Sequence, residues 1–178
     1  MNILNKNILL AVGLVALLWS VFSWPLPTVL DRGIPSSSQN IELHERRSLI
    51  PGDQLQLYYS FWLVRQMVHG DIPWFQNVYE FNEGDDDARR ELRHFYLPIS
   101  VPCALLSFLT GPVIAWNLTG FATLLLSYVF AFYVYRSFTE DRWTAHAGAL
   151  VSIAIPYRWV NFLGGSPAGF AMLWPAAM

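Results

Sequence analysis

Charge and cysteine are both scarce in this sequence. Only 13% of its 178 residues are charged, and the formal net charge is -2. Soluble domains usually carry about 25% charged residues, so the composition argues against a soluble globular domain. A net charge near zero also argues against a nucleic-acid-binding protein. The single cysteine, Cys103, excludes an internal disulfide and a metal site built from several cysteines.

Apolar residues take the place of the missing charge, at 54% of the chain. No charged residue occurs in residues 7–30, 97–135 or 159–178, and most charged residues lie between residues 31 and 93. The apolar runs are continuous rather than alternating, which disfavours membrane strands. The pattern predicts an all-α integral membrane protein with three to four transmembrane helices and one large extracytoplasmic loop.

We expect three parts along the chain. They are residues 1–30 with the first transmembrane helix, residues 31–96 as an extracytoplasmic loop with an interfacial helix at about 53–69, and residues 97–178. The last part should hold a short juxtamembrane helix at 97–109, a span at 112–135, a third span starting at residue 143 and the start of a fourth. Because the final apolar run reaches Met178 without a polar flank, we expect the chain to be the N-terminal part of a longer protein.

The first apolar run, residues 8–27, spans about 30 Å as a helix, which matches a hydrocarbon core. A cleaved signal peptide is the alternative, but a lone Lys6 and the lack of a small-x-small cleavage site favour an uncleaved anchor. Basic residues mark cytoplasmic segments. Lys6, with Arg136 and Arg142 in a short loop at 136–142, therefore predicts a cytoplasmic N-terminus.

The loop contains an aromatic-rich segment that follows Gly52-Asp53. Tyr58, Tyr59 and Trp62, with Leu55 and Leu63, recur at helical spacing and predict an amphipathic helix lying flat on the outer leaflet. Gly70 and Pro73 should end it. Asp53 and Gln56 form a D-x-x-Q capping pattern, and this structural role is compatible with a catalytic one.

Other charged or polar residues have competing interpretations. Arg158 follows Pro156-Tyr157 between two uncharged runs, so it either reaches the interface from a helix end or binds an anion, most simply a phosphate, at the membrane surface. Asp85, Asp86 and Asp87 fit a solvated helix start better than a divalent-cation site. The four histidines show no ligand spacing and are expected at surfaces or interfaces.

The order of these features resembles a known superfamily. A first span, the Gly52-Asp53 loop, the H-G-D-I-P-W turn at 69–74, the G-P-V-I-A-W-N-L segment at 111–118 and P-Y-R at 156–158 follow one another. This resembles the N-terminal part of bacterial multi-spanning GT-C-type glycosyltransferases and their YfhO-like, uncharacterised relatives.

The resemblance implies a chemistry and a location. Such enzymes work in the bacterial inner membrane and transfer a sugar with inversion from a polyprenyl-phosphate-linked donor to a glycan, lipid or protein acceptor outside. Asp53 matches the catalytic base, and Arg158, or less well Arg65, would bind the donor phosphate. Tyr58, Tyr59 and Trp62 would line the sugar or lipid groove, with membrane anchoring as their alternative. A divalent cation remains an open requirement. The alternatives are a non-catalytic membrane scaffold or partner subunit, and a transporter fragment, in which essential charges would lie within the spans.

Overall fold

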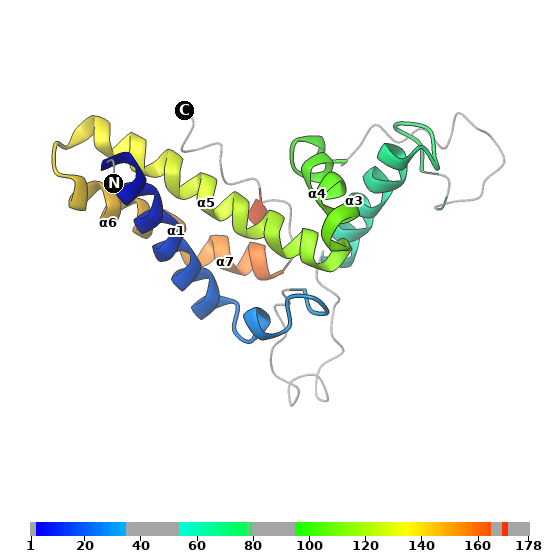
Figure 1. Cartoon of the computed structure of the whole chain (residues 1–178), viewed down its shortest axis with the longest axis horizontal. Helices are drawn as coiled ribbons and strands as arrows, with labels where there is room; N and C mark the ends of the chain where they lie inside the picture. Colours follow the sequence, from blue (N-terminus) through cyan, green and yellow to red (C-terminus); the bar gives the residue numbers. More distant parts are fainter. Residues whose placement is uncertain (1–2, 35–53, 78, 80–94, 165–168, 171–178) are drawn as a thin grey trace.

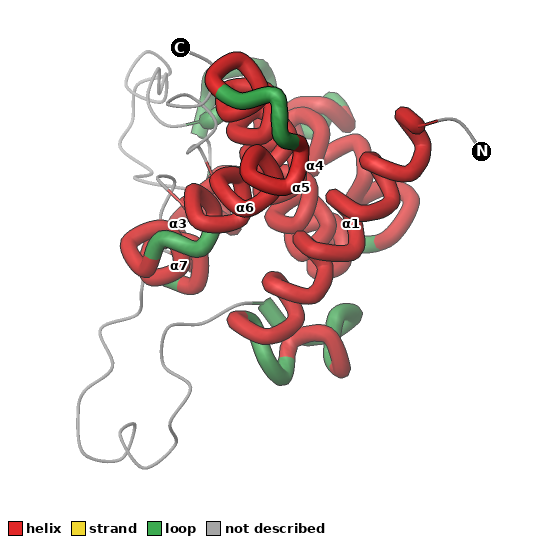
Figure 2. Tube along the Cα trace, turned by 90° about the vertical axis from the view of Figure 1, so that its left-hand side faces the viewer, coloured by secondary structure: helices red, strands yellow, loops and turns green. Residues whose placement is uncertain are grey.

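The computed structural model describes residues 3–34, 54–77, 79, 95–164 and 169–170. These residues form six α-helices and one 3-10 turn, with no strand among them, as Figure 2 shows. The all-α prediction is confirmed for this part of the chain. The helices are α1 (Ile3–Phe22), η1 (Leu26–Thr28), α3 (Gln54–His69), α4 (Leu97–Thr110), α5 (Pro112–Phe138), α6 (Arg142–Ile153) and α7 (Pro156–Leu163).

The longest helix, α5, forms the axis of the molecule (Figure 1). Its 27 residues extend for about 40 Å at 1.5 Å per residue. Within the described ranges it is the one helix long and apolar enough to cross a membrane, whereas α1 and α4 contain shorter apolar stretches. The structure therefore supports one membrane span and leaves the prediction of three to four unconfirmed.

Helices α1, α6 and α7 pack along α5. We call these four helices the body. Helix α6 runs back along α5 after a short loop, and the start of α1 lies at the same end as that loop (Figure 1). Small residues allow the close approach, because Ala145 and Ala149 of α6 are completely buried. On α1, Ala11, Val15 and Trp19 recur every four residues and form its buried stripe.

Helices α3 and α4 pack against each other at the other end of α5 (Figure 1). The buried face of α3 carries Leu57, Phe61, Val64 and Met67, which follow helical spacing. Among the predicted stripe residues whose side chains are described, Leu63 is buried, and Tyr58, Tyr59 and Trp62 are partly buried and pack against the core. The location of this helix on the outer leaflet stays a prediction.

Several boundaries agree with the sequence and two do not. Gly70, at φ +89°, ends α3 by donating its N–H to the carbonyls of Gln66 and Met67. The expected loop at 136–142 is shorter, because α5 continues to Phe138. The expected third span is interrupted, since α6 ends after 12 residues at Ile153 and α7 begins at Pro156.

Candidate functional site

The expected catalytic carboxylate, Asp53, lies outside the described residues, which resume at Gln54 with α3. The helix that follows it in the sequence is described, and its contacts are as follows. Tyr58 lies edge-on to Trp116 of α5, with ring centroids 5.5 Å apart. Trp116 in turn contacts Phe170 at 5.0 Å. The helix that follows Asp53 is therefore held against the spanning helix.

The aromatic residues expected to line a groove contact the protein itself. The Tyr59 hydroxyl donates to Asn77 Oδ1 at 2.9 Å. Trp62 stacks with Tyr59 at 5.7 Å and lies 4.8 Å from the ring of Tyr79. Burial raises the pKa of the Tyr58 phenol, with a smaller contribution from Cys103 partly offset by the nearby Arg65 cation. Tyr58 is therefore neutral at physiological pH.

Tyr58, Trp62 and Arg65 line one small cavity between α3, α4 and the start of α5. Its volume is about 20 Å³, which is enough for roughly one water molecule. A sugar is far too large for it. The structure thus brings three of the sequence-predicted residues together, but around a space that holds no substrate.

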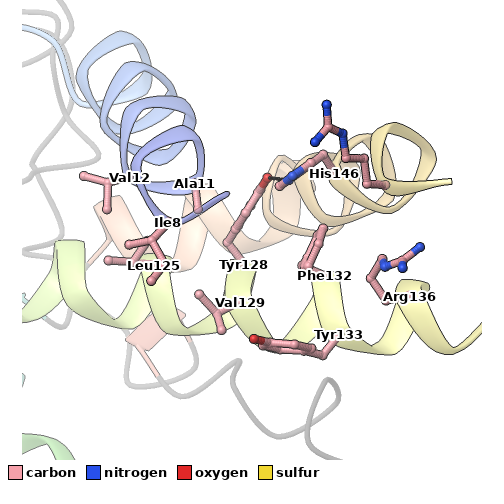
Figure 3. A pocket seen from close by; sticks show the side chains of 11 residues that line it. Ile8, Ala11, Val12, Leu125, Tyr128, Val129, Phe132, Tyr133, Arg136 and His146 are labelled. Atoms are coloured by element: carbon pink, nitrogen blue, oxygen red, sulfur yellow. Dashed lines mark hydrogen bonds between the residues drawn. The ribbon is translucent and has the colours of Figure 1, made fainter. Parts of the chain in front are cut away.

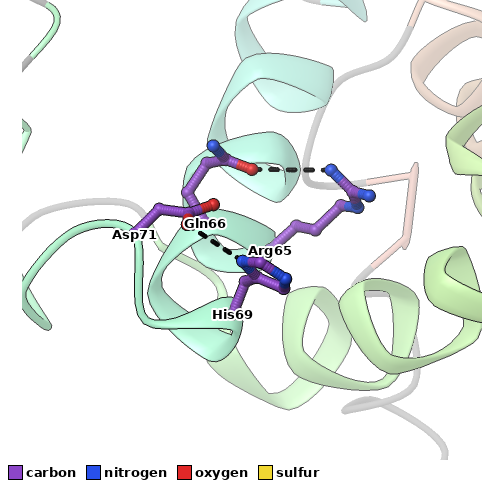
Figure 4. Close-up of polar contacts among 4 residues, drawn as sticks. All are labelled: Arg65, Gln66, His69 and Asp71. Carbon is purple, nitrogen blue, oxygen red and sulfur yellow. Dashed lines mark hydrogen bonds and ion pairs between the residues drawn. The ribbon is translucent and has the colours of Figure 1, made fainter.

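Arg65 is fixed by stacking rather than by a carboxylate. Its guanidinium carbon lies 5.0 Å from the centroid of the Phe108 ring, a cation–π distance. Its Nη1 donates to Gln66 Oε1 at 3.5 Å (Figure 4). The same view shows His69 Nδ1 and Asp71 Oδ1 at 2.9 Å, an exposed pair at the turn after α3.

Arg158 occupies a very different environment, because it is only 2% exposed. Its Nη2 donates to Ser127 Oγ at 2.9 Å and makes a longer contact of 3.4 Å to the carbonyl of Thr123. Its Nε is buried and has no hydrogen-bond partner in the described structure. No carboxylate among the described residues forms an ion pair with it. A buried positive charge is thus held by neutral oxygens of α5.

Arg158 is buried rather than exposed at a helix end, and the break between α6 and α7 explains why. Pro156 has no N–H to donate, which favours a new helix start at this position. Trp159 Nε1 donates to the free carbonyl of Ile153 at 2.9 Å, across the break. Helix α7 therefore begins inside the body and directs Arg158 against the middle of α5.

The two arginines proposed for phosphate binding do not meet in the described structure. Arg65 shares its cavity with Trp116 near the start of α5, whereas Arg158 contacts Ser127. Ser127 lies about 16 Å further along α5 than Trp116, at 1.5 Å rise per residue. One phosphate group cannot contact both arginines in this arrangement.

The run Asp85, Asp86 and Asp87 falls outside the described residues. Among the residues that are described, no group of three or more His, Cys, Asp or Glu side chains could hold a metal ion. The divalent-cation requirement therefore stays a prediction.

The sequence analysis missed a buried pair between α5 and α6. The Tyr128 hydroxyl oxygen lies 2.5 Å from His146 Nδ1, and His146 is only 4% exposed. The sequence assigned His146 to a surface or an interface without a partner. No local sequence signal identifies this pair, because its members lie 18 positions apart on two helices.

Comparison with protein-family models finds no match. Comparisons with curated proteins and with solved structures find none either. The interpretation of the site therefore rests on the geometry and chemistry of its own residues.

Proposed function

We propose that this chain forms part of a membrane glycosyltransferase that uses a polyprenyl-phosphate-linked sugar. The acceptor is a glycan, lipid or protein on the outer side of the bacterial inner membrane, and the anomeric centre is inverted. The observation that carries the proposal is Arg158, a buried cation without a described carboxylate partner. Buried charges are normally paired, and a charge inside a membrane domain usually serves a function.

In this proposal the donor phosphate supplies the anion that Arg158 lacks. The guanidinium would stabilise the negative charge that develops on the leaving phosphate. Because α5 and α7 enclose Arg158, access requires α7 to move away from α5. Helix α7 has eight residues and joins α6 through a two-residue break, so it is the element suited to this movement. Arg65, held near the start of α5, is assigned to packing between α3 and α4.

Asp53 is the proposed general base. It would deprotonate the acceptor hydroxyl as that hydroxyl attacks the anomeric carbon. The arrangement of the helices supports this assignment, because the start of α1 and the α5–α6 loop lie at one end of α5 and helix α3 lies towards the other (Figure 1). If Lys6, Arg136 and Arg142 mark the cytoplasmic end, helix α3, which follows Asp53 in the sequence, lies towards the outer side, where donor and acceptor meet.

The test is the Asp53→Asn variant in the native membrane. Since asparagine caps helices as well as aspartate, the amount of folded protein should not change. Loss of a general base should lower the rate of sugar transfer by about 10²–10⁴-fold, measured as accumulation of polyprenyl-phosphate-linked sugar in lipid extracts. Asp31→Asn, at an exposed position after η1, is the matched control and should keep the wild-type rate.

A second function, a non-catalytic scaffold or partner subunit, is favoured by one observation. Tyr58 and Trp62 surround a cavity of about 20 Å³, and Tyr59 and Trp62 contact other residues of the same protein. A scaffold should lose function on deletion of the chain but tolerate Asp53→Asn. Unchanged sugar transfer in Asp53→Asn, together with loss of transfer in the deletion, would establish this alternative.

A further inference from the structure

A second, much larger cavity lies between α1, α5 and α6. Its volume is about 450 Å³, within the range of small-molecule binding sites. Figure 3 shows its walls, with Ala11 and Val12 on α1, and Leu125 and Val129 on α5. Neither α3 nor Arg158 contributes a residue to its lining, so the proposed sugar transfer makes no use of it.

The shape of this cavity suits a hydrocarbon chain. Its lining on α5 runs from Leu125 to Arg136, about 16 Å of helix. Half of a hydrocarbon core is about 15 Å thick, so the cavity matches the depth of one leaflet. Ile8 and Tyr133 at its rim are 53% and 61% exposed, so the cavity opens to the outside of the helices. A lipid chain could therefore enter from the side.

The charged residues that line the cavity are both cationic. Arg136 comes from the end of α5 and Arg142 from the first turn of α6. Glu140 and Asp141 lie in the intervening loop but do not line the cavity. The Asp141 carboxylate is also occupied, because it accepts hydrogen bonds from the backbone and hydroxyl of Thr144. The mouth of the cavity thus has the charge that an anionic headgroup requires.

A buried, unsatisfied donor provides an independent indication of a ligand. His146 lines the cavity, is 4% exposed, and its Nε2 has no hydrogen-bond partner in the described structure. If Tyr128 donates to Nδ1, only the Nε2–H remains unsatisfied. The opposite arrangement would leave both the Tyr128 hydroxyl proton and Nε2 unsatisfied, which costs more. The first arrangement is therefore favoured, and in it the Nε2 proton lacks an oxygen acceptor.

These groups lie on facing helix stripes. Tyr128, Phe132 and Arg136 are spaced four residues apart on α5, and Arg142 and His146 are four apart on α6. Figure 3 shows Tyr128 and Phe132 directed towards α6 and the bond from Tyr128 to His146. The two arginines thus lie at one end of the cavity lining, and His146 lies further along it, beside Tyr128 and Phe132.

We propose that this cavity binds an anionic phospholipid of the leaflet at the α5–α6 loop. One acyl chain lies against Val12, Leu125 and Val129, and Arg136 and Arg142 bind the headgroup phosphate. His146 Nε2 donates to an oxygen at the junction between headgroup and chain. This lipid is a resident ligand, distinct from a polyprenyl-phosphate donor at Arg158.

Native mass spectrometry of the full chain released from nanodiscs tests the proposal. The nanodiscs contain phosphatidylglycerol and phosphatidylcholine in equal amounts. We expect one phosphatidylglycerol molecule to remain bound to the wild type. Each arginine near an anionic surface strengthens binding by about fivefold. The double variant Arg136→Gln/Arg142→Gln should therefore retain on the order of 25-fold less phosphatidylglycerol than the wild type. Equal retention of the two lipids by the wild type would overturn the proposal.

Two further variants separate this site from the general lipid shell. The Val129→Trp variant fills the cavity with a larger side chain while both arginines remain. This variant should lose the bound lipid. Arg32→Gln removes an exposed arginine far from the cavity lining, and it should retain the lipid as the wild type does. If Val129→Trp retains as much phosphatidylglycerol as the wild type, the cavity is not the lipid-binding site.

A measurement on the unmodified protein avoids any dependence on folding of the variants. Phosphatidylglycerol with a photoreactive diazirine in its acyl chain should label peptides from the first half of α1 and the second half of α5. Excess inorganic phosphate should not reduce the labelling, because the chain contributes to binding. Labelling spread evenly over the apolar helices, or abolished by inorganic phosphate, would contradict a phospholipid site.

Discussion

The body around α5 and helix α4 satisfy their buried polar groups in different ways. In the body, hydrogen bonds join separate elements: Arg158 donates to Ser127, and Tyr128 pairs with His146. In α4, the hydroxyls of Ser100 and Ser107 donate to carbonyls of their own chain segment, Phe95 and Ala104. Directional bonds between helices fix their relative rotation, whereas bonds within one helix do not.

The apolar clusters differ in the same sense. The cluster shared by α3 and α4 contains Leu63, Val64, Met67 and Ala104, and it is held by apolar packing together with the Arg65–Phe108 cation–π contact between the two helices. The body adds polar anchors to its apolar core. Asn117 Nδ2 of α5, for example, donates to the carbonyls of Leu30 and Gly33 after α1. We infer that the α3–α4 unit tolerates repacking better than the body does.

The largest expected effect concerns the residue that joins the two regions. Trp116 is 2% exposed and contacts Tyr58 and Phe61 of α3. Trp116→Ala should lower the free energy of unfolding by about 3–5 kcal/mol, measured by denaturant titration in micelles. Trp143→Ala, at a position 58% exposed, is the control. Similar losses in both variants would show that α3 and α5 are not coupled through Trp116.

The next effect compares a serine from each region. Ser127→Ala leaves the buried Nη2 of Arg158 with only its 3.4 Å contact to Thr123. This should cost about 1–3 kcal/mol of unfolding free energy. Ser107→Ala removes a bond within α4 and should change the same quantity by about 0.5 kcal/mol or less. Equal losses of unfolding free energy in Ser127→Ala and Ser107→Ala would contradict the proposed difference between the body and helix α4.

A glycine pair tests the packing of the body. A Cβ at Gly120 would lie 2.7 Å from Phe162 Cζ of α7, whereas a Cβ at Gly13 would have no neighbouring atom within 4 Å. Overpacking costs about 1–3 kcal/mol, partly offset by the better helix propensity of alanine, so Gly120→Ala should lose about 1 kcal/mol net. Gly13→Ala should gain stability. A gain in both variants would mean that Phe162 moves aside freely.

Local features of the fold could be predicted from the sequence because they depend on single residues. Gly111 followed by Pro112 marks the start of α5, and Gly70 ends α3 as expected. The rotation of the helices could not be predicted. Helix α5 is apolar on all sides, so periodicity gives no preferred face, and its contacts with Arg158 depend on that rotation.

The candidate site was predictable only as a set of residue types. A charged residue in an apolar run singled out Arg158, but the break at residues 154–155 determines where its side chain lies. The Tyr128–His146 pair joins residues 18 positions apart on two helices. Such pairs require the packed structure, because each partner alone has an ordinary local sequence. Asp53 remains a prediction in the part of the chain outside the described residues.

The smallest expected effect is a pH dependence at the start of α6. Asp141 caps this helix, and hydrogen bonds from the Thr144 hydroxyl, the Thr144 N–H and the Trp143 N–H lower the pKa of its carboxyl. A lowered folded-state pKa contributes stability above the unfolded-state pKa, and this contribution is lost as pH falls through the folded-state value. Unfolding temperatures measured from pH 7 to pH 3 should therefore fall more for the wild type than for Asp141→Asn.

The asparagine variant isolates this charge because it caps without titrating. The exposed variant Glu140→Gln should keep the wild-type profile, since Glu140 makes no side-chain contribution to the cap. The acid profiles of the wild type and Asp141→Asn differ only if the Asp141 carboxylate is ionised in the folded protein. Identical profiles for the wild type and Asp141→Asn would show that the backbone, rather than the carboxylate charge, holds the start of α6 at Arg142. The headgroup site would then depend on the body packing alone.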